Sequence, residues 1–301
     1  MNLRQLEYFL AVAKSLNITG AAADLGVAQP TLTKSIRALE EELGVQLFDR
    51  LPRGVQLTEF GQSLLRHAET VNVQVQDAMS EIDWLRRGAV GTVSIGAGPA
   101  WLRRHLPVSL ARTVMANPAV RARVVGGYDD VLLRALRRGE LDFVVAELPL
   151  RELSQDLAIE RLTADELGPC CRADHPLARQ NEPEPCQLLE FPWILPPRNT
   201  RSHRRLQALF VALDLPLPQI VVETESMAFI LNMLRESDAL SFLGSTTMQW
   251  SEGQDIAMLK VPRISAVREA GLISRKDGWL SPAATAIIAE LRIVCAARPK
   301  N

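Results

Sequence analysis

Residues 29–44 read QPTLTKSIRALEEELG, an amphipathic pattern with a proline near its start and a glycine at its end. Proline fits the first turn of a helix, where its missing N–H is not needed, and glycine readily ends one. Apolar side chains recur every three or four residues, which places one stripe of them against a core. We predict a helix from Pro30 to Leu43, with a buried stripe made of Leu32, Ile36, Leu39 and Leu43.

The opposite face of this helix carries groups suited to reading DNA. Amide, hydroxyl and cationic side chains hydrogen-bond base edges and phosphates, whereas the acidic run Glu40–Glu42 would repel phosphate. We expect the N-terminal half of the helix to enter the major groove. From this helix alone, an ordinary amphipathic helix with a solvated face is equally compatible. The predicted contacts are Gln29, Pro30, Thr31, Thr33, Lys34 and Arg37.

The flanking segments fit a helix-turn-helix with a wing. Residues 3–14 have helical spacing, and Thr19 is the expected N-cap of a short helix over residues 20–25. Residues 47–58 place two short apolar stretches around a Pro-Arg-Gly turn, which predicts a hairpin. Arg50 and Arg53 lie on this hairpin, where they would reach a flanking phosphate or the minor groove.

Composition sets outer limits on the function. The chain has 301 residues, 47 % of them hydrophobic, and a formal net charge of −1. This charge gives no support to a nucleic-acid partner, and residues 1–58 carry six Lys/Arg against six Asp/Glu. DNA binding therefore depends on where the charges lie. No signal peptide and no apolar run of ~20 residues is evident, so we expect a soluble, cytoplasmic protein that enters no membrane.

The first 65 residues resemble the LysR-type transcriptional regulators. Thr31 and Thr33 stand where serine is common in that family, and Gly20 stands where a cation or another side chain is frequent, so one phosphate contact is in doubt. The resemblance implies a regulator that binds double-stranded DNA as a homodimer or homotetramer, contacts RNA polymerase and senses a small molecule. The matching segments are LRQLEYF (3–9), QPTLT (29–33), LEEELGVQLF (39–48), RG (53–54) and LTEFG (57–61).

A long helix is expected to follow the hairpin. Residues 58–87 contain no proline, and Thr58 can cap their start. Their apolar residues are spaced as the a and d positions of a coiled coil. A helix of this length spans roughly 45 Å, which is hard to bury in one small domain. A partner helix is therefore expected, with a core helix as the alternative. The predicted dimerisation seam is Leu64, Ala68, Val71, Val75, Ala78, Ile82 and Leu85.

Beyond Gly88 the pattern alternates between strands and helices, which indicates an α/β fold with parallel strands. We predict an α/β chain with an N-terminal all-α winged helix-turn-helix (1–58), a linker helix (59–88) and an effector-binding domain (89–301). The resemblance implies two lobes similar to periplasmic solute-binding proteins, lobe I at about 89–161 and 268–301 and lobe II at about 162–267. Strands are expected at 92–96, 120–125, 141–145, 220–224 and 272–274.

Neither a catalytic nor a metal-binding constellation is evident, and no cofactor is expected. Gly96-Ala97-Gly98 begins like a dinucleotide-binding motif, but Trp101 stands where the third glycine is needed. A solute-binding protein would leave residues 1–65 unused, and an enzyme would lack catalytic groups. For Cys170, Cys171, Cys186 and Cys295, we expect buried thiols and leave a redox pair open.

The expected effector site follows from the resemblance and lies where strands end and helices start. Free N–H groups at helix starts favour an anion, and arginines near residue 201 add positive charge, so we expect a small carboxylate. A solvated helix face is the alternative for that basic run. The predicted site residues are Gly98, Pro99, Ala100, Trp101, Gly127, Tyr128, Asn199, Thr200, Arg201, Ser202, Glu225, Ser226 and Met227.

Overall fold

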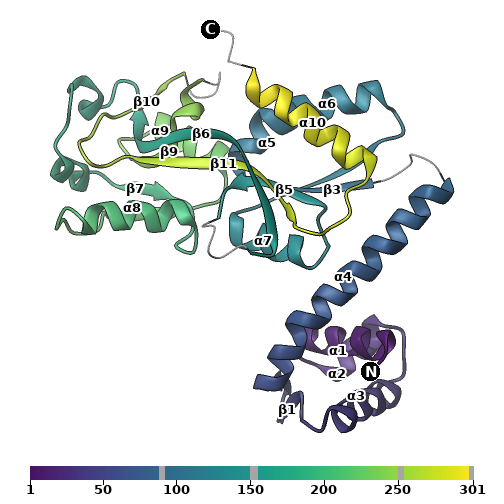
Figure 1. The fold of residues 1–301 in the computed structure, drawn as a ribbon. Helices are drawn as coiled ribbons and strands as arrows, with labels where there is room; N and C mark the ends of the chain where they lie inside the picture. The colour runs from purple at the N-terminus through teal and green to yellow at the C-terminus, as the bar shows by residue number, and fades with distance from the viewer. Residues whose placement is uncertain (88–91, 150–154, 250–253, 298–301) are drawn as a thin grey trace. The chain divides into compact units, whose positions relative to one another are not determined.

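The computed structural model describes residues 1–87, 92–149, 155–249 and 254–297 (Figure 1). The chain divides into an N-terminal unit that ends with the long helix α4 and a C-terminal unit that begins with strand β3. Within the described ranges, no helix is both long enough and apolar enough to cross a membrane.

The N-terminal unit packs three short helices, a hairpin and the start of a long helix around one core. Gly44 ends α3 in the left-handed region, with φ of 71°, as glycine allows. Phe9, Leu32 and Leu39 are fully buried in this core. The elements are α1 (Leu3–Ser15), α2 (Ile18–Asp24), α3 (Gln29–Leu43), β1 (Phe48–Leu51), β2 (Gly54–Leu57) and α4 (Glu59–Arg87).

Three details of this unit differ from the sequence prediction. Asn17, not Thr19, caps α2: the Asn17 side chain accepts from two backbone N–H groups of the first turn, at 2.9 and 3.1 Å. Leu43 is 41 % exposed, because the last turn of α3 extends past the core. Leu64 and Ala68 pack against the core of the unit. Ala68 is therefore buried within its own chain, and an exposed seam on α4 begins only after it.

The C-terminal unit is built on a seven-stranded mixed sheet in the order β10-β6-β11-β5-β3-β4, with β9 beside β6. The expected parallel pairing holds for β3 with β4 and β5, but β6 pairs antiparallel with β9, β10 and β11. The strands of this sheet are β3 (Thr92–Ala97), β4 (Arg121–Gly126), β5 (Phe143–Glu147), β6 (Leu157–Arg172), β9 (Ser241–Gly244), β10 (Ile256–Met258) and β11 (Ala266–Arg275). β7 (Trp193–Leu195) and β8 (Ile220–Glu223) form a separate parallel pair.

Helices cover this sheet and the separate strand pair (Figure 1). Three start with a serine or threonine cap: Thr200 for α8, Ser226 for α9 and Ser281 for α10. The helices are α5 (Pro99–Arg103), α6 (His105–Ala116), α7 (Asp129–Arg137), α8 (Arg201–Val211), α9 (Met227–Arg235) and α10 (Pro282–Ala296), with short 3-10 turns η2 (Pro176–Arg179), η3 (Pro185–Glu190) and η4 (Ser245–Gln249).

Strands β6 and β11 run from one end of the sheet to the other. β11 pairs with β5 through residues 270–274, and β6 pairs with β9 and β10 through residues 167–172. We call the part around β3, β4 and β5 the first half and the part around β7, β8, β9 and β10 the second half. The β6–β11 register shifts between Ala270 and Gly271. A Cβ at Gly271 would lie 2.0 Å from the Glu160 carbonyl oxygen, so only glycine fits this bulge.

Candidate functional site

The outer face of α3 presents the predicted polar residues. Gln29, Pro30, Thr31, Lys34 and Arg37 are exposed. Thr33 is half-buried, and its hydroxyl accepts a hydrogen bond from the Gln29 side-chain amide at 2.9 Å. These groups lie on one helix surface and leave the apolar stripe to the core, as a helix that enters a groove requires.

Glu40 does not belong to the solvated acidic end of α3. Its side chain is buried, and Oε1 accepts hydrogen bonds from the backbone N–H groups of Leu47 at 2.8 Å and Phe48 at 3.2 Å. The prediction that Glu40 belongs to the acidic run that would repel phosphate is therefore wrong. The carboxylate instead joins α3 to the first strand of the wing. No sequence signal indicated this contact, because the partners of Glu40 are backbone N–H groups of a later segment.

The wing is also fixed to the end of α1. β1 pairs with β2 antiparallel, with Phe48 opposite Leu57 at one end and Leu51 opposite Gly54 at the other. Pro52 and Arg53 therefore form the two-residue turn. The Val55 N–H donates to the Leu16 carbonyl at 3.0 Å. Gly54 has φ of 99°, and a Cβ there would lie 2.5 Å from the same carbonyl oxygen. Arg50 and Arg53 are exposed on this anchored hairpin, which supplies cations beside the helix surface.

The later part of α4 exposes large apolar side chains. Ile82 is 63 % exposed and Leu85 is 68 % exposed, and Val71 and Met79 are also exposed. Ala78 is exposed and Val75 is half-buried. Exposed apolar residues at a and d spacing are typical of a helix that packs against a partner helix.

A cavity of about 70 Å³ lies in the C-terminal unit. Residues from the predicted site that line it come from the start of α5, from the loop before α7 and from the start of α8. They are Gly98, Pro99, Ala100, Trp101, Tyr128, Arg201 and Ser202. Helix starts of both halves therefore meet at one cavity, as expected for a ligand site in an open α/β sheet.

Other predicted site residues do not line this cavity. Thr200 is buried, and its hydroxyl donates to the Pro197 carbonyl at 2.8 Å while it caps α8. Ser226 caps α9 through a hydrogen bond from the Phe229 N–H at 3.2 Å. The remaining residues outside the lining are Gly127, Asn199, Glu225 and Met227. Cap-forming side chains are already engaged by their own helices, which explains why they are turned away from the cavity.

Sequence reasoning missed a cluster of three polar residues, which are Asp165 on β6, Arg268 on β11 and Thr246 on η4. Arg268 donates from Nε to Oδ1 of Asp165 at 2.8 Å and from Nη2 to Oδ2 at 2.7 Å, and the Thr246 hydroxyl donates to the same carboxylate at 3.0 Å. All three residues line the cavity. Asp165 and Arg268 are cross-strand partners, so their pairing depends on a register between segments 103 residues apart.

Arginines of α8 join the second half to the end of β5 in the first half. Arg201 donates from Nη1 to the Leu148 carbonyl at 2.8 Å and to the Glu147 carbonyl at 3.4 Å. Arg205 pairs with the Glu147 carboxylate at 2.7 Å, and the Glu147 side chain is only 9 % exposed. We call these contacts the α8–β5 clasp. The cavity is lined by Glu147 and Arg201, so the clasp forms part of its wall.

His105 and Trp101 form the aromatic wall of the cavity. Their ring centroids are 5.4 Å apart. Burial, assisted by the charge of Arg104, lowers the pKa of His105. The imidazole is therefore neutral at pH 7 and adds no charge to the site.

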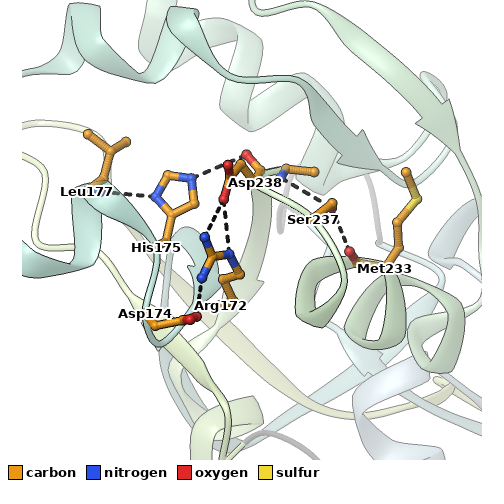
Figure 2. A network of polar contacts seen from close by, with 8 residues as sticks. Arg172, Asp174, His175, Leu177, Met233, Ser237 and Asp238 are labelled. Atoms are coloured by element: carbon orange, nitrogen blue, oxygen red, sulfur yellow. Dashed lines mark hydrogen bonds and ion pairs between the residues drawn. The ribbon is translucent and has the colours of Figure 1, made fainter.

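A second polar network lies at the end of β6 (Figure 2), and none of its residues lines the cavity. Arg172 contacts Asp174, and it donates to Oδ1 of Asp238 from Nε at 3.0 Å and from Nη2 at 2.7 Å. His175 is fully buried: Nδ1 accepts from the Leu177 N–H at 3.1 Å, and Nε2 is 3.2 Å from the Asp238 carbonyl. Burial lowers the His175 pKa. These contacts fix the turn after β6, so His175 has a structural role here.

All four cysteines are free thiols. Cys170 and Cys171 are buried as expected, and burial raises the pKa of Cys171 to about 12. Burial also raises the pKa of Cys295 to about 11. Cys186 is exposed, contrary to the expectation of a buried thiol. Cys171 and Cys295 are therefore poor sources of thiolate near neutral pH.

The geometry defines a class of protein: a DNA-binding helix-turn-helix module joined to an α/β ligand-binding unit. Known proteins match both parts. Residues 3–62 match the family described as "Bacterial regulatory helix-turn-helix protein, lysR family". Residues 86–296 match "LysR substrate binding domain". The chain therefore belongs to the LysR family, and it is a DNA-binding transcriptional regulator with a substrate-binding domain rather than an enzyme.

Relatives cover nearly the whole chain. The HTH-type transcriptional regulator GbpR of Azospirillum brasilense is 32 % identical over 294 residues, which cover 97 % of this chain and 86 % of GbpR. PcaQ of Agrobacterium fabrum is 30 % identical, with 92 % and 89 % covered. The crystal structure of CbnR, a LysR family transcriptional regulator, has a TM-score of 0.61 at 22 % identity, with 99 % of this chain and 100 % of CbnR covered. This likeness is one of fold.

Proposed function

We propose that this regulator senses a small carboxylate in the cavity between the two halves of its C-terminal unit. The observation that carries the proposal is the balance of charge at the cavity wall. Three guanidinium groups, those of Arg201, Arg205 and Arg268, lie in or directly behind the wall, against the two carboxylates of Glu147 and Asp165. Arg201 and Arg268 line the cavity directly, and a carboxylate is a strong charged acceptor for guanidinium N–H donors.

The start of α8 adds to this preference. Arg201 and Ser202 are the first residues of α8, and both line the cavity. The first N–H groups of a helix have no intrahelical acceptor, and they carry the positive end of the helix dipole. A carboxylate oxygen is a suitable partner for them.

The size of the cavity limits what fits without rearrangement. Its volume is about 70 Å³, which is smaller than the cavity of about 150 Å³ that binds benzene. Only a ligand of a few non-hydrogen atoms fits as the halves stand. A larger effector requires the halves to separate, and the contacts of the α8–β5 clasp are among those that such a motion must break.

The test is a thermal-shift screen of the full chain with two- to six-carbon carboxylates, each paired with its amide as a neutral counterpart. We expect stabilisation by a carboxylate that approaches about 2.7 kcal/mol at 100 times its Kd. Arg201→Ala should remove the shift, and Arg204→Ala, on the exposed face of the same helix, should keep it. Hits confined to neutral or cationic compounds, or hits indifferent to Arg201→Ala, would contradict the proposal.

We further propose that the regulator binds its operator as a homodimer or homotetramer. The exposed half of α3 and the arginines of the wing are the proposed DNA contacts, and Val71 to Leu85 of α4 form the proposed seam. One small module buries only about 600–1,000 Å² on DNA, too little for most specific affinities. Two modules held together gain affinity through effective concentration. Contact with RNA polymerase rests on the family resemblance alone.

A further inference from the structure

His105 differs from the other polar residues of the effector cavity, which is our name for the cavity of about 70 Å³ described above. The residue begins α6, lines the cavity and packs its ring against Trp101. Among the residues that the structure describes, neither ring nitrogen has a hydrogen-bond partner, and Nδ1 is also shut off from solvent. Buried polar atoms are almost always hydrogen-bonded, so the cavity wall contains an imidazole whose hydrogen-bonding capacity is unused.

The other three histidines of the chain do not share this arrangement. His175 and His203 are fully buried, and both nitrogens of each ring are engaged. In His203, Nδ1 lies 2.9 Å from a backbone carbonyl oxygen and Nε2 lies 3.2 Å from the side-chain amide of Gln207. His67 is exposed on α4, far along the chain from the cavity residues. A ligand in the cavity therefore meets one imidazole whose protonation is not set by a hydrogen bond within the protein.

The charged groups around His105 come from several elements. Arg103 and Arg104 precede it in the chain, and α10, which packs against α6, places Glu290 at 3.6 Å from Arg112. Burial, assisted by the charge of Arg104, lowers the pKa of His105, so the ring is neutral at pH 7 until a negative charge arrives. The charged residues that line the cavity are Glu147 on β5 and Asp165 on β6, each hydrogen-bonded to an arginine, and Arg201 on α8 and Arg268 on β11.

The small size of the cavity brings any bound anion close to this ring. A volume of about 70 Å³ corresponds to a sphere about 5 Å across, so a carboxylate in it lies within the roughly 4–6 Å over which an opposite charge acts on a pKa. Such a charge raises the pKa of an imidazole by about one unit or more. A carboxylate also accepts hydrogen bonds only, which suits the imidazolium ion, because both of its nitrogens donate.

We propose that His105 takes up a proton from solvent when a carboxylate binds in the effector cavity, so that the regulator binds its effector more tightly as the pH falls. The new N–H bond forms on the imidazole ring, and no bond of the ligand changes. By linkage, a ligand that strengthens proton binding at His105 is itself bound more tightly when that proton is present. The inference rests on the function proposed for this cavity, because it requires an anionic ligand there.

NMR of the full chain, labelled at histidine, measures the protonation of His105 directly. The probe is acetate, which is small enough for the closed cavity and stays ionised between pH 6 and 8, and the strongest carboxylate of the thermal-shift screen is the second probe. Sodium chloride keeps the ionic strength equal. We expect a saturating carboxylate to raise the midpoint of the His105 ring signal by about one pH unit. Its Kd should be at least threefold lower at pH 6 than at pH 8, since one unit corresponds to at most about tenfold.

Matched variants assign the effect to His105. His105→Gln has no titrating group, so its Kd for the carboxylate should be the same at pH 6 and pH 8, whereas His67→Gln should keep the full difference. A carboxylate whose stabilisation depends on Arg201 but which leaves the His105 midpoint unmoved overturns this inference and leaves the proposed function standing. A pH dependence that persists in His105→Gln also overturns it. Absence of binding by every carboxylate of the screen removes both this inference and the proposed function.

Discussion

Replacing Glu40 with alanine tests whether the wing is held by the recognition helix. The variant removes the oxygen that accepts from the Leu47 and Phe48 N–H groups, and both of these residues are buried. An unsatisfied buried donor costs about 1–3 kcal/mol, so two donors cost at least about 2 kcal/mol. That figure corresponds to about a 30-fold change in the local opening equilibrium, because 1.4 kcal/mol is tenfold.

Amide hydrogen exchange of the full chain measures this opening directly at residues 47 and 48. We expect Glu40→Ala to speed exchange there about 30-fold and to weaken binding to a duplex from the regulator's own promoter, because the wing arginines lose their fixed position. Glu40→Gln keeps an acceptor oxygen, so its effect should be under about tenfold. Glu41→Ala, at an exposed position, is the matched control. Exchange that is equal in Glu40→Ala and Glu41→Ala would refute the reasoning.

Three further predictions concern DNA binding, assembly and pH. Arg53→Ala should weaken duplex binding and lower the slope of log K against log salt by about one, as measured by anisotropy; an unchanged slope would remove this residue from the phosphate contacts. Ile82→Glu should dissociate the dimer in sedimentation, whereas Ser80→Glu, on the outer side of the helix, should not. Burial lowers the His175 pKa, so the unfolded chain binds more protons below its ordinary value of about 6.5 and stability falls as the pH drops through that region. Urea unfolding at several pH values should show a shallower fall for His175→Gln.

The DNA-binding unit was largely predictable because its signals are local. Proline, glycine and the apolar period of three to four residues predicted the bounds of α3 to within one residue. The Pro-Arg-Gly turn predicted the position of the hairpin that forms the wing. The errors also have local causes. Asn17 and Thr19 are both good caps, and sequence alone does not tell which one stands at the helix start. Glu40 looked like a third solvated acid, because its partners are backbone groups of a later segment.

The effector cavity was half predictable for a different reason. Helix starts can be located from glycine, proline and cap residues, and Trp101, Tyr128 and Arg201 do line the cavity. Asp165 and Arg268 stand in the middle of long strands, and their meeting depends on a cross-strand register with a bulge at Gly271. Nothing local in either strand encodes that register. The α8–β5 clasp was missed likewise, because the acceptors of Arg201 are carbonyl groups.

The α8–β5 clasp constrains which ligands can act as signals. A ligand that fits the closed cavity contacts both halves, so it binds the clasped state more tightly and holds the chain in the arrangement that it already has. A carboxylate that draws Arg201 from the Leu148 and Glu147 carbonyls replaces neutral acceptors with a charged one, which is roughly twice as strong a partner. Its affinity then differs between the clasped and released states. An effective inducer is therefore expected to be larger than the 70 Å³ cavity, and the smallest carboxylates should bind and compete without inducing.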